Sequence, residues 1–417
     1  MSTLPCPPAQ DLPPGESIRH ADAATLRSAL ADARAALLRM AEAWRAVLPR
    51  SMEIRYAPEL NPPRWELGHV AWFEERWIAR NPQRLQGAAA DPDAARAAPL
   101  LAGADALYDS STVAHTKRWH LNLPGYAHTL DLMARTRART LALLDDAPED
   151  DDGLYFFRLA LVHEDMHREA WAYMAQHLAL DVGAALGATA PAASTATGDW
   201  SLPGGPFTLG RAGGGFSFDN ERGAHEIELA PFSIARAPVT WREMLAFIDA
   251  GGYDDERLWS REGWAWRQQL QAGRPRTLGR EEDDGAWRVA RFGRWVAPEL
   301  DAPALHLSAH EAQAWCAWAG RRLPTEAEWE CAAVTAAATG EAFDWGQVWE
   351  WTASAFSPYP GFTPHPYRDY SMPWFDGRPV LRGASFATSP RLRHPRYRNY
   401  FEAGRNALFA GFRTCAV

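Results

Sequence analysis

The run Leu161-Val-His-Glu-Asp-Met-His-Arg-Glu169 decides how the first half of this chain folds. His163 and His167 stand four residues apart in a segment with helical periodicity, so both imidazoles project from one face, about one turn apart. Two neutral imidazoles at this spacing can share one metal ion. We therefore expect a long helix that carries part of a metal site.

Residues 20–182, which surround this run, have the periodicity of a helical bundle. Apolar side chains recur at three- and four-residue steps, the pattern of a helix with one buried face. We expect four long helices, at residues 21–48, from Pro62 to about Ile78, at 126–144 and at 153–180. A long irregular segment, 81–124, separates the second helix from the third. Four such helices predict an up-and-down bundle, a fold that builds metal sites from facing helices.

The rest of the chain follows a different pattern. Residues 183–199 are small and nearly featureless, so we expect a linker there. From 200 to 417, short apolar runs are broken by Gly, Pro, Asp and Trp, which predicts an α+β domain with long packed loops. Helical periodicity in this part is confined to residues 241–250, 309–319 and 326–333. The chain is thus expected to have two domains, 20–182 and 200–417, joined by 183–199.

Composition and charge exclude several classes of function. The net charge of −9 and the lack of a Lys/Arg run argue against a nucleic-acid partner. The first residues contain several prolines but no apolar core of a signal peptide, and no stretch is apolar enough to span a membrane. The four cysteines, Cys6, Cys316, Cys331 and Cys415, have no metal-binding spacing and fit a reducing compartment. We therefore expect a cytoplasmic protein without a membrane partner.

The same histidine pair also spells His-Glu-x-x-His, the pattern of zinc proteases. The extended form of that pattern requires Gly and His where this chain has Ala170 and Tyr173. Glu164 would have to be the general base of a protease, and its simpler interpretation is a solvated helix residue. A protease is therefore not expected.

Six short strings in the second half occur in a specific order. They are PGGPFTLG (203–210), APVT (237–240), AGRRLPTEAEWE (319–330), VWEWT (348–352), LRGAS (381–385) and GFR (411–413). Together they resemble the formylglycine-generating-enzyme-like (sulfatase-modifying-factor) domain, a variant of the C-type-lectin fold, over about 200–417. The parent activity of that domain, oxidation of a cysteine to formylglycine, is not expected, because Cys316 and Cys331 are interpreted as small buried hydrophobes.

The first half resembles a DinB-like four-helix bundle with a His…His-x-x-x-His-x-Glu pattern. A chain that joins these two domains resembles the ergothioneine-type sulfoxide synthases and their relatives, the selenoneine synthases. The resemblance implies a mononuclear non-haem Fe(II) that uses O₂ to attach sulfur or selenium to the imidazole of hercynine (trimethylhistidine). It also implies a third ligand on the second helix, so the expected ligands are His69, His163 and His167. Three histidines leave coordination positions open, but they do not by themselves separate iron from zinc.

The segment 397–406 resembles the stretch that lies against hercynine in these enzymes. Asn399 and Tyr400 match its Asn and aromatic residue, and an aromatic face attracts a trimethylammonium group. Arg405 keeps a basic position, whereas Phe401 replaces an Asp that helps to hold γ-glutamylcysteine in the family. The family's Arg-x-x-Arg pair is also not evident in residues 108–120. Because fixed Arg and Asp partners bind a charged thiol best, we expect a less charged donor.

The resemblance further implies a tyrosine that donates a proton, on the loop that follows residues 349–352. Tyr359 is the candidate, with Phe362 as a competitor for the same position. Tyr367 and Tyr370 are held in reserve as loop aromatics.

The sequence thus predicts an Fe(II) enzyme that uses O₂ to join hercynine to a selenosugar, as a selenoneine synthase does. The alternative donor is γ-glutamylcysteine or cysteine, as in the ergothioneine-type sulfoxide synthases. Two hypotheses from other classes stay open. One is a non-catalytic binding protein with a lectin-like fold, and the other is a zinc-dependent thiol transferase, since DinB-like bundles also host those.

Overall fold

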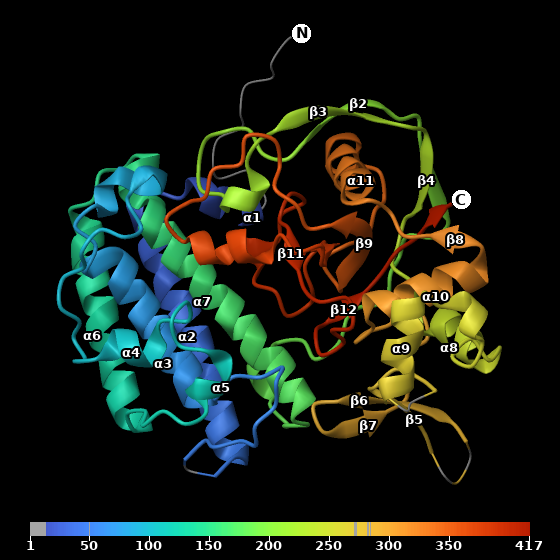
Figure 1. Ribbon diagram of the computed structural model, residues 1–417, viewed down its shortest axis with the longest axis horizontal. Coiled ribbons are helices and arrows are strands. Elements are labelled where there is room, and N and C mark those ends of the chain that lie inside the picture. Colours follow the sequence, from blue (N-terminus) through green and yellow to red (C-terminus); the bar gives the residue numbers. More distant parts are fainter. Residues whose placement is uncertain (1–13, 50, 271–272, 282, 284) are drawn as a thin grey trace.

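The computed structural model describes residues 14–49, 51–270, 273–281, 283 and 285–417 (Figure 1). The first half is helical and the second half is α+β, as the sequence predicts. Residues 1–13 lie outside the described residues. They include Cys6 and most of the segment in which no signal peptide was expected. Of the helices that are described, none is long and apolar enough to cross a lipid bilayer.

Four long helices pack against one another in the first half (Figure 1, blue to green). They are α2 (Ala23–Val47), α3 (Pro63–Glu74), α6 (Tyr126–Asp145) and α7 (Asp151–His177). Each lies within a few residues of its predicted bounds, and α3 continues as a π-helix over Glu75–Ala79. The side chains of Asp22 and Asp150 accept backbone hydrogen bonds at the starts of α2 and α7, as helix caps do. Short helices, α1 (Pro14–Ser17), α4 (Ala104–Tyr108) and α5 (His115–Arg118), complete this half.

A buried network of four charged side chains ties the bundle together, one from each long helix. Its members are Arg34 (α2), Glu74 (α3), Arg137 (α6) and Glu164 (α7), and each is at most 9% exposed. Arg34 contacts Glu164 at 2.6 Å and Glu74 at 2.7 Å, and Arg137 contacts Glu74 at 2.8 Å and Glu164 at 2.5 Å. The interpretation of Glu164 as a solvated residue is therefore wrong. Periodicity could not reveal its partners, because they lie on three other helices.

The second half contains two four-stranded sheets, with strand orders β1-β4-β13-β8 and β11-β10-β9-β12. The first comprises β1 (Asp199–Leu202), β4 (Phe232–Ala235), β13 (Cys415–Ala416) and β8 (Arg321–Arg322). The second comprises β11 (Asn399–Tyr400), β10 (Pro379–Arg382), β9 (Trp349–Ala355) and β12 (Ala410–Gly411). Its edge strand β11 consists of two of the predicted substrate residues. The pair β12–β9 is parallel, whereas β10 is antiparallel to both β9 and β11.

The remaining elements of the second half surround these sheets (Figure 1). They are the hairpin β2 (Gly205–Leu209) and β3 (His225–Leu229), the three-stranded sheet β5 (Leu278–Arg280), β6 (Trp287–Arg291) and β7 (Arg294–Val296), and the helices α8 (Trp241–Asp249), α9 (Arg261–Leu270), α10 (Ala309–Ala319) and α11 (Glu326–Thr339). Three of these helices begin where the sequence predicts them, each at a Ser or Thr capping box, and α9 was not anticipated. Cys316 is buried in α10 as expected, whereas Cys331 is only half-buried.

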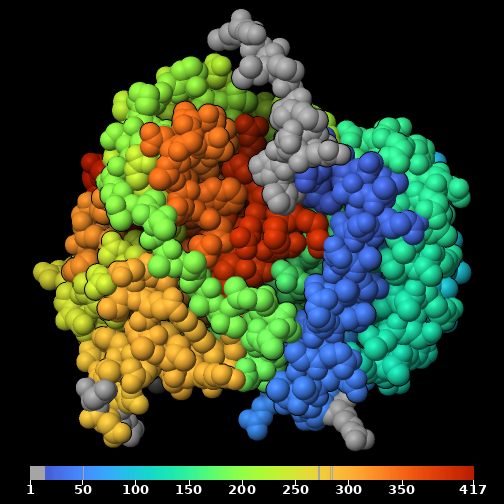
Figure 2. Space-filling view, turned by 180° about the vertical axis from the view of Figure 1, so that it is seen from behind, coloured from blue at the N-terminus to red at the C-terminus, as the bar shows by residue number. Residues whose placement is uncertain are grey.

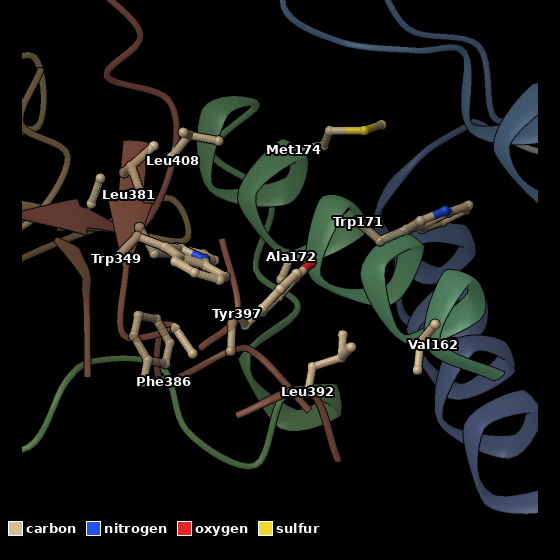
Figure 3. Packing of buried hydrophobic residues seen from close by; sticks show 14 of the residues in the cluster. Val162, Trp171, Ala172, Met174, Trp349, Leu381, Phe386, Leu392, Tyr397 and Leu408 are labelled. Atoms are coloured by element: carbon tan, nitrogen blue, oxygen red, sulfur yellow. The ribbon is translucent and has the colours of Figure 1, made fainter. Parts of the chain in front are cut away.

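The two halves share one apolar core that is centred on α7. In Figure 3, Trp171 and Met174 extend from α7, and Trp349 and Tyr397 of the second half lie beside the same helix. Figure 2 shows from behind that the C-terminal segment, in red, lies between α2 and the orange part of the second half. The last bundle helix ends at His177 and the first strand begins at Asp199. We propose that the domain boundary lies in residues 183–199, the segment that follows this helix and reaches the start of this strand.

Replacing Arg137 with Ala is expected to lower the free energy of unfolding by about 3–5 kcal/mol, because two buried carboxylates lose a partner. Urea denaturation followed by tryptophan fluorescence measures this loss. Arg135→Ala is the matched control, since Arg135 lies on the same helix in an exposed pair with Asp131 and should change stability by less than about 1 kcal/mol. Equal, small losses in both variants would contradict the role of the network.

Candidate metal centre and adjoining cavity

Three histidines come together between α3 and α7. His69 on α3 and His163 and His167 on α7 place ligand nitrogens within 4.8 Å of one another. The Nε2 atoms of His163 and His167 are 3.2 Å apart, close to the roughly 3 Å that separates two nitrogens bound to one ion at about 2.1 Å. His69 and His163 are buried and His167 is half-buried. The structure therefore brings the three predicted ligands together in a geometry that fits one metal ion.

Two of the imidazoles are oriented by partners of their Nδ1 atoms. His69 Nδ1 donates to the carbonyl oxygen of Tyr108 at 2.8 Å, and His167 Nδ1 donates to Glu66 Oε2 at 2.5 Å. A proton on Nδ1 leaves the Nε2 lone pair free for a metal. Glu66 is itself fixed, because its other oxygen accepts a hydrogen bond from the Asn61 amide at 2.6 Å. These contacts orient the donor atoms before any ion binds.

Close packing around the histidines fixes the same geometry. The Phe73 ring stacks on His163 with 3.5 Å between the ring centroids. A Cβ atom at Gly68 would lie 2.2 Å from the Tyr108 ring, so the residue before His69 must be a glycine for Tyr108 to come this close. This approach brings the Tyr108 carbonyl within hydrogen-bond distance of His69.

Burial keeps two of the candidate ligands, His69 and His163, neutral. It lowers the pKa of His69 to about 3 and lowers the pKa of His163 well below its ordinary value of 6.5. Burial acts to raise the pKa of Glu66, but the charge and hydrogen bond of His167 outweigh it, so this pKa lies below its ordinary value. Near neutral pH, His69 and His163 thus offer neutral imidazole lone pairs beside the Glu66 carboxylate, as a divalent cation requires.

A cavity of about 390 Å³ adjoins the histidine trio at His167. One wall is α7, which contributes Met166, His167, Glu169, Ala170 and Tyr173. The opposite wall comes from the second half and is largely aromatic, with Trp349, Tyr370, Trp374, Tyr397, Tyr400, Phe401 and Phe409. The cavity therefore lies between the two halves, where ligand sites often form.

All the substrate residues predicted from the sequence line this cavity, namely Asn399, Tyr400, Phe401 and Arg405. Asn399 Oδ1 accepts a hydrogen bond from the backbone N–H of Tyr400 at 2.9 Å, which leaves the Asn399 amide group as a donor. Arg405 Nη2 donates to the carbonyl oxygen of Glu59 in the first half at 2.7 Å. Its Nε is buried without a hydrogen-bond partner among the described residues, so it remains available to a ligand.

Tyr359 is placed elsewhere, and it is not among the residues that line the cavity. Its hydroxyl donates to Glu326 at 3.3 Å, and the Arg398 guanidinium lies 4.1 Å from its ring centroid. Glu326 and Arg398 form a buried ion pair at 2.9 Å, and Tyr359 packs against this pair beneath α11. The sequence could not predict where the Tyr359 side chain packs, because Tyr359 lies on a loop without periodicity.

Two other tyrosines of the same loop lie near the histidines. Tyr370 lines the cavity together with His167, and its hydroxyl donates to the Tyr397 hydroxyl at 3.2 Å. The Tyr367 ring centroid is 6.1 Å from that of His163, and Tyr367 also lines a second cavity of about 210 Å³. The fold thus brings Tyr367 and Tyr370, the alternative candidates from the sequence, close to the histidines.

Glu66 and Tyr108 are partners of the site that sequence reasoning missed. Glu66 precedes His69 by three residues on α3 and therefore shares its face of the helix, which is a signal that the sequence contained. Tyr108 accepts the hydrogen bond of His69 with its backbone carbonyl oxygen. Any residue has this group, so the sequence contained no sign of the contact.

Comparison with known proteins gives two kinds of match. A family model described as the sulfatase-modifying factor enzyme 1-like domain matches residues 186–347 and 344–416. The hercynine oxygenase of Mycolicibacterium smegmatis is 36% identical over 93% of this chain and 98% of its own length. The hercynine oxygenase of Mycobacterium tuberculosis is 34% identical over 92% of this chain and 96% of its own length. The formylglycine-generating enzyme of Streptomyces coelicolor is 36% identical but covers only 36% of this chain.

Replacing Glu66 with Gln is expected to weaken metal binding by about 10- to 100-fold, because His167 loses its anionic partner. Calorimetric titration of the metal-free protein with Fe(II) under anaerobic conditions measures the affinity. Glu75→Gln is the matched control, since Glu75 is also buried but its carboxylate accepts from the Leu100 backbone and pairs with Arg139. If Glu66→Gln bound metal as tightly as this control, Glu66 would have no orienting role.

Proposed function

This chain belongs to the family of the hercynine oxygenases, and we propose that it is an O₂-dependent enzyme that joins a selenium or sulfur donor to the imidazole ring of hercynine. The observation that carries this proposal is the trio of converging histidines, two of them buried and neutral, beside an aromatic cavity. The full-length relatives contain both halves, and in this chain both halves line the cavity.

In this proposal, His69, His163 and His167 hold Fe(II). The fit rests on the inward Nε2 atoms, the 3.2 Å between two of them and the neutral state of the buried rings. Iron held by three imidazoles supplies open coordination positions for O₂ and for a substrate atom. The choice of iron over zinc rests on the family, because the ligand set alone suits both.

The residues of the second half position hercynine. The aromatic face of Tyr400 attracts the trimethylammonium group. The Asn399 amide and the unpartnered Nε of Arg405 are donors for the carboxylate, and a fixed guanidinium binds a carboxylate well. Because these groups come from one strand and the segment that follows it, they hold the substrate as a unit against α7.

We infer that Tyr370, rather than Tyr359, donates the proton that the reaction needs. Tyr370 lines the same cavity as His167, and burial raises its pKa well above the ordinary value of 10, which keeps the hydroxyl protonated. The Tyr397 hydroxyl accepts its hydrogen bond at 3.2 Å and orients it.

We also infer that the donor is a selenosugar rather than a charged thiol such as γ-glutamylcysteine. The described lining of the cavity contains two cationic side chains, Arg378 and Arg405. Arg378 already pairs with Asp376 at 2.7 Å and with Glu402 at 3.4 Å. With Arg405 assigned to hercynine and Phe401 in the place of an acid, a donor with its own charged groups would find few partners.

Purified protein reconstituted with Fe(II) is expected to consume O₂ and form a carbon–selenium bond when it is given hercynine and a 1-selenosugar. An oxygen electrode follows the uptake, and mass spectrometry identifies the product. Parallel reactions with the matching thiosugar, γ-glutamylcysteine and cysteine rank the donors. Faster turnover of γ-glutamylcysteine would overturn the choice of donor. If the protein consumed no O₂ with any of the donors but transferred a thiol under anaerobic conditions with Zn(II), the proposal of an O₂-dependent enzyme would be wrong.

Replacing Tyr370 with Phe is expected to lower the rate of product formation by about 10²- to 10⁴-fold, the usual contribution of a positioned proton donor. Iron content and hercynine affinity should stay near those of the wild type. Tyr359→Phe removes the same atom from a tyrosine outside the cavity and should change the rate by less than about threefold. The opposite ranking of the two variants would restore Tyr359 as the donor.

A further inference from the structure

The carboxylate of Glu169 is a part of the cavity that the proposed mechanism does not yet use. Glu169 follows His167 by two residues on α7, lines the cavity and is only 8% exposed. Its Oε1 accepts hydrogen bonds from Trp349 Nε1 at 2.8 Å and Ser385 Oγ at 2.6 Å, and its Oε2 accepts one from Thr388 Oγ1 at 2.7 Å. All three donors belong to the second half, so the carboxylate is held across the boundary between the halves.

These partners are neutral, so they stabilise the charge of the carboxylate without cancelling it. In all three contacts a Glu169 oxygen is the acceptor, so none of them uses the carboxyl group as a donor. Glu169 has no ion pair among the described residues. Arg393 and Arg168, the arginines beside it, donate instead to backbone carbonyls of the segment 386–388. The described residues therefore place a carboxylate without a cationic partner at the wall of the cavity.

A quaternary ammonium group is the cation that suits such an anion. It has no N–H, so it needs negative charge and aromatic faces and makes no hydrogen bonds. Glu169 offers charge, while three of its roughly four acceptor sites are already occupied by the protein. Trp349 and Tyr397, which line the same cavity, offer aromatic faces next to it. A primary ammonium would find too few free acceptors there, and its buried N–H groups would be left unpaired.

We propose that Glu169 is the counter-charge for the trimethylammonium group of hercynine, and that it thereby selects the trimethylated substrate over histidine. This inference rests on the proposed function, since it assigns a residue to the substrate of that same site. Glu169 is in this view a binding residue of the cavity and also a contact that joins the two halves.

The test compares two ligands that differ in the cationic group. Hercynine and 3-(imidazol-4-yl)propionate share the imidazole and the carboxylate, but only hercynine carries the trimethylammonium. Anaerobic calorimetry on the Fe(II)-loaded protein gives both affinities. In Glu169→Gln the affinity for hercynine is expected to fall on the order of tenfold to a hundredfold, while that for imidazolylpropionate changes by less than about threefold. The wild-type preference for hercynine over histidine should narrow in the same variant.

Ser385→Ala is the matched control, because it removes one hydrogen bond to Glu169 and keeps the charge. This variant should lose thermal stability but retain its preference for hercynine over imidazolylpropionate. An equal loss of both ligands in Glu169→Gln, or no loss of hercynine, would show that Glu169 only joins the halves and would overturn the inference. If the wild-type protein bound no hercynine, the proposed function itself would fail, and this inference with it.

Discussion

Two arginines and two glutamates, buried between the four long helices, hold the first half in one arrangement. A buried ion pair is favourable only when every partner is in place, because each unpaired charge keeps its full desolvation cost. The network of Arg34, Glu74, Arg137 and Glu164 therefore permits one register of the helices. Glu164 directly follows His163, and Glu74 lies five residues after His69. The register that satisfies the charges thus also sets the distance between the candidate ligands, before any metal contributes.

Helix α7 connects this network with the rest of the molecule. It places Glu164 in the ion network of the bundle, His163 and His167 at the metal centre, and Glu169 against the second half. Helix α7 is covered by the bundle on one side and by the second half on the other, so most of its buried polar groups need hydrogen-bond or ion-pair partners. These partners are the ion network and residues of the second half. A shift of α7 along its axis would disturb the ion network, the histidine trio and the contact between the halves together.

The two walls of the cavity differ in chemistry. The wall on α7 carries the imidazole of His167 and the carboxylate of Glu169, and hydrogen bonds fix the positions of both. The wall of the second half is aromatic and contributes Arg405 as its cation with a free N–H. This division suits a reaction in which a metal and a zwitterionic imidazole substrate must be held side by side. Phe401 belongs to the second wall alone, so a substitution there would change the lining of the cavity and leave the histidine trio in place.

The sequence by itself determined the helices, the histidine trio and the nature of the second half. Periodicity and capping boxes are local signals, His163 and His167 share a helix face, and the six ordered strings identify a domain whose relatives are known. Only the tertiary structure decided the contacts between distant segments. Glu164, which was expected on the surface, is buried, and the cavity is lined by Tyr370 and not by the expected Tyr359. The reason is physical: a loop without periodicity takes its path from what it packs against, and a buried charge is placed by partners that lie far away in the sequence.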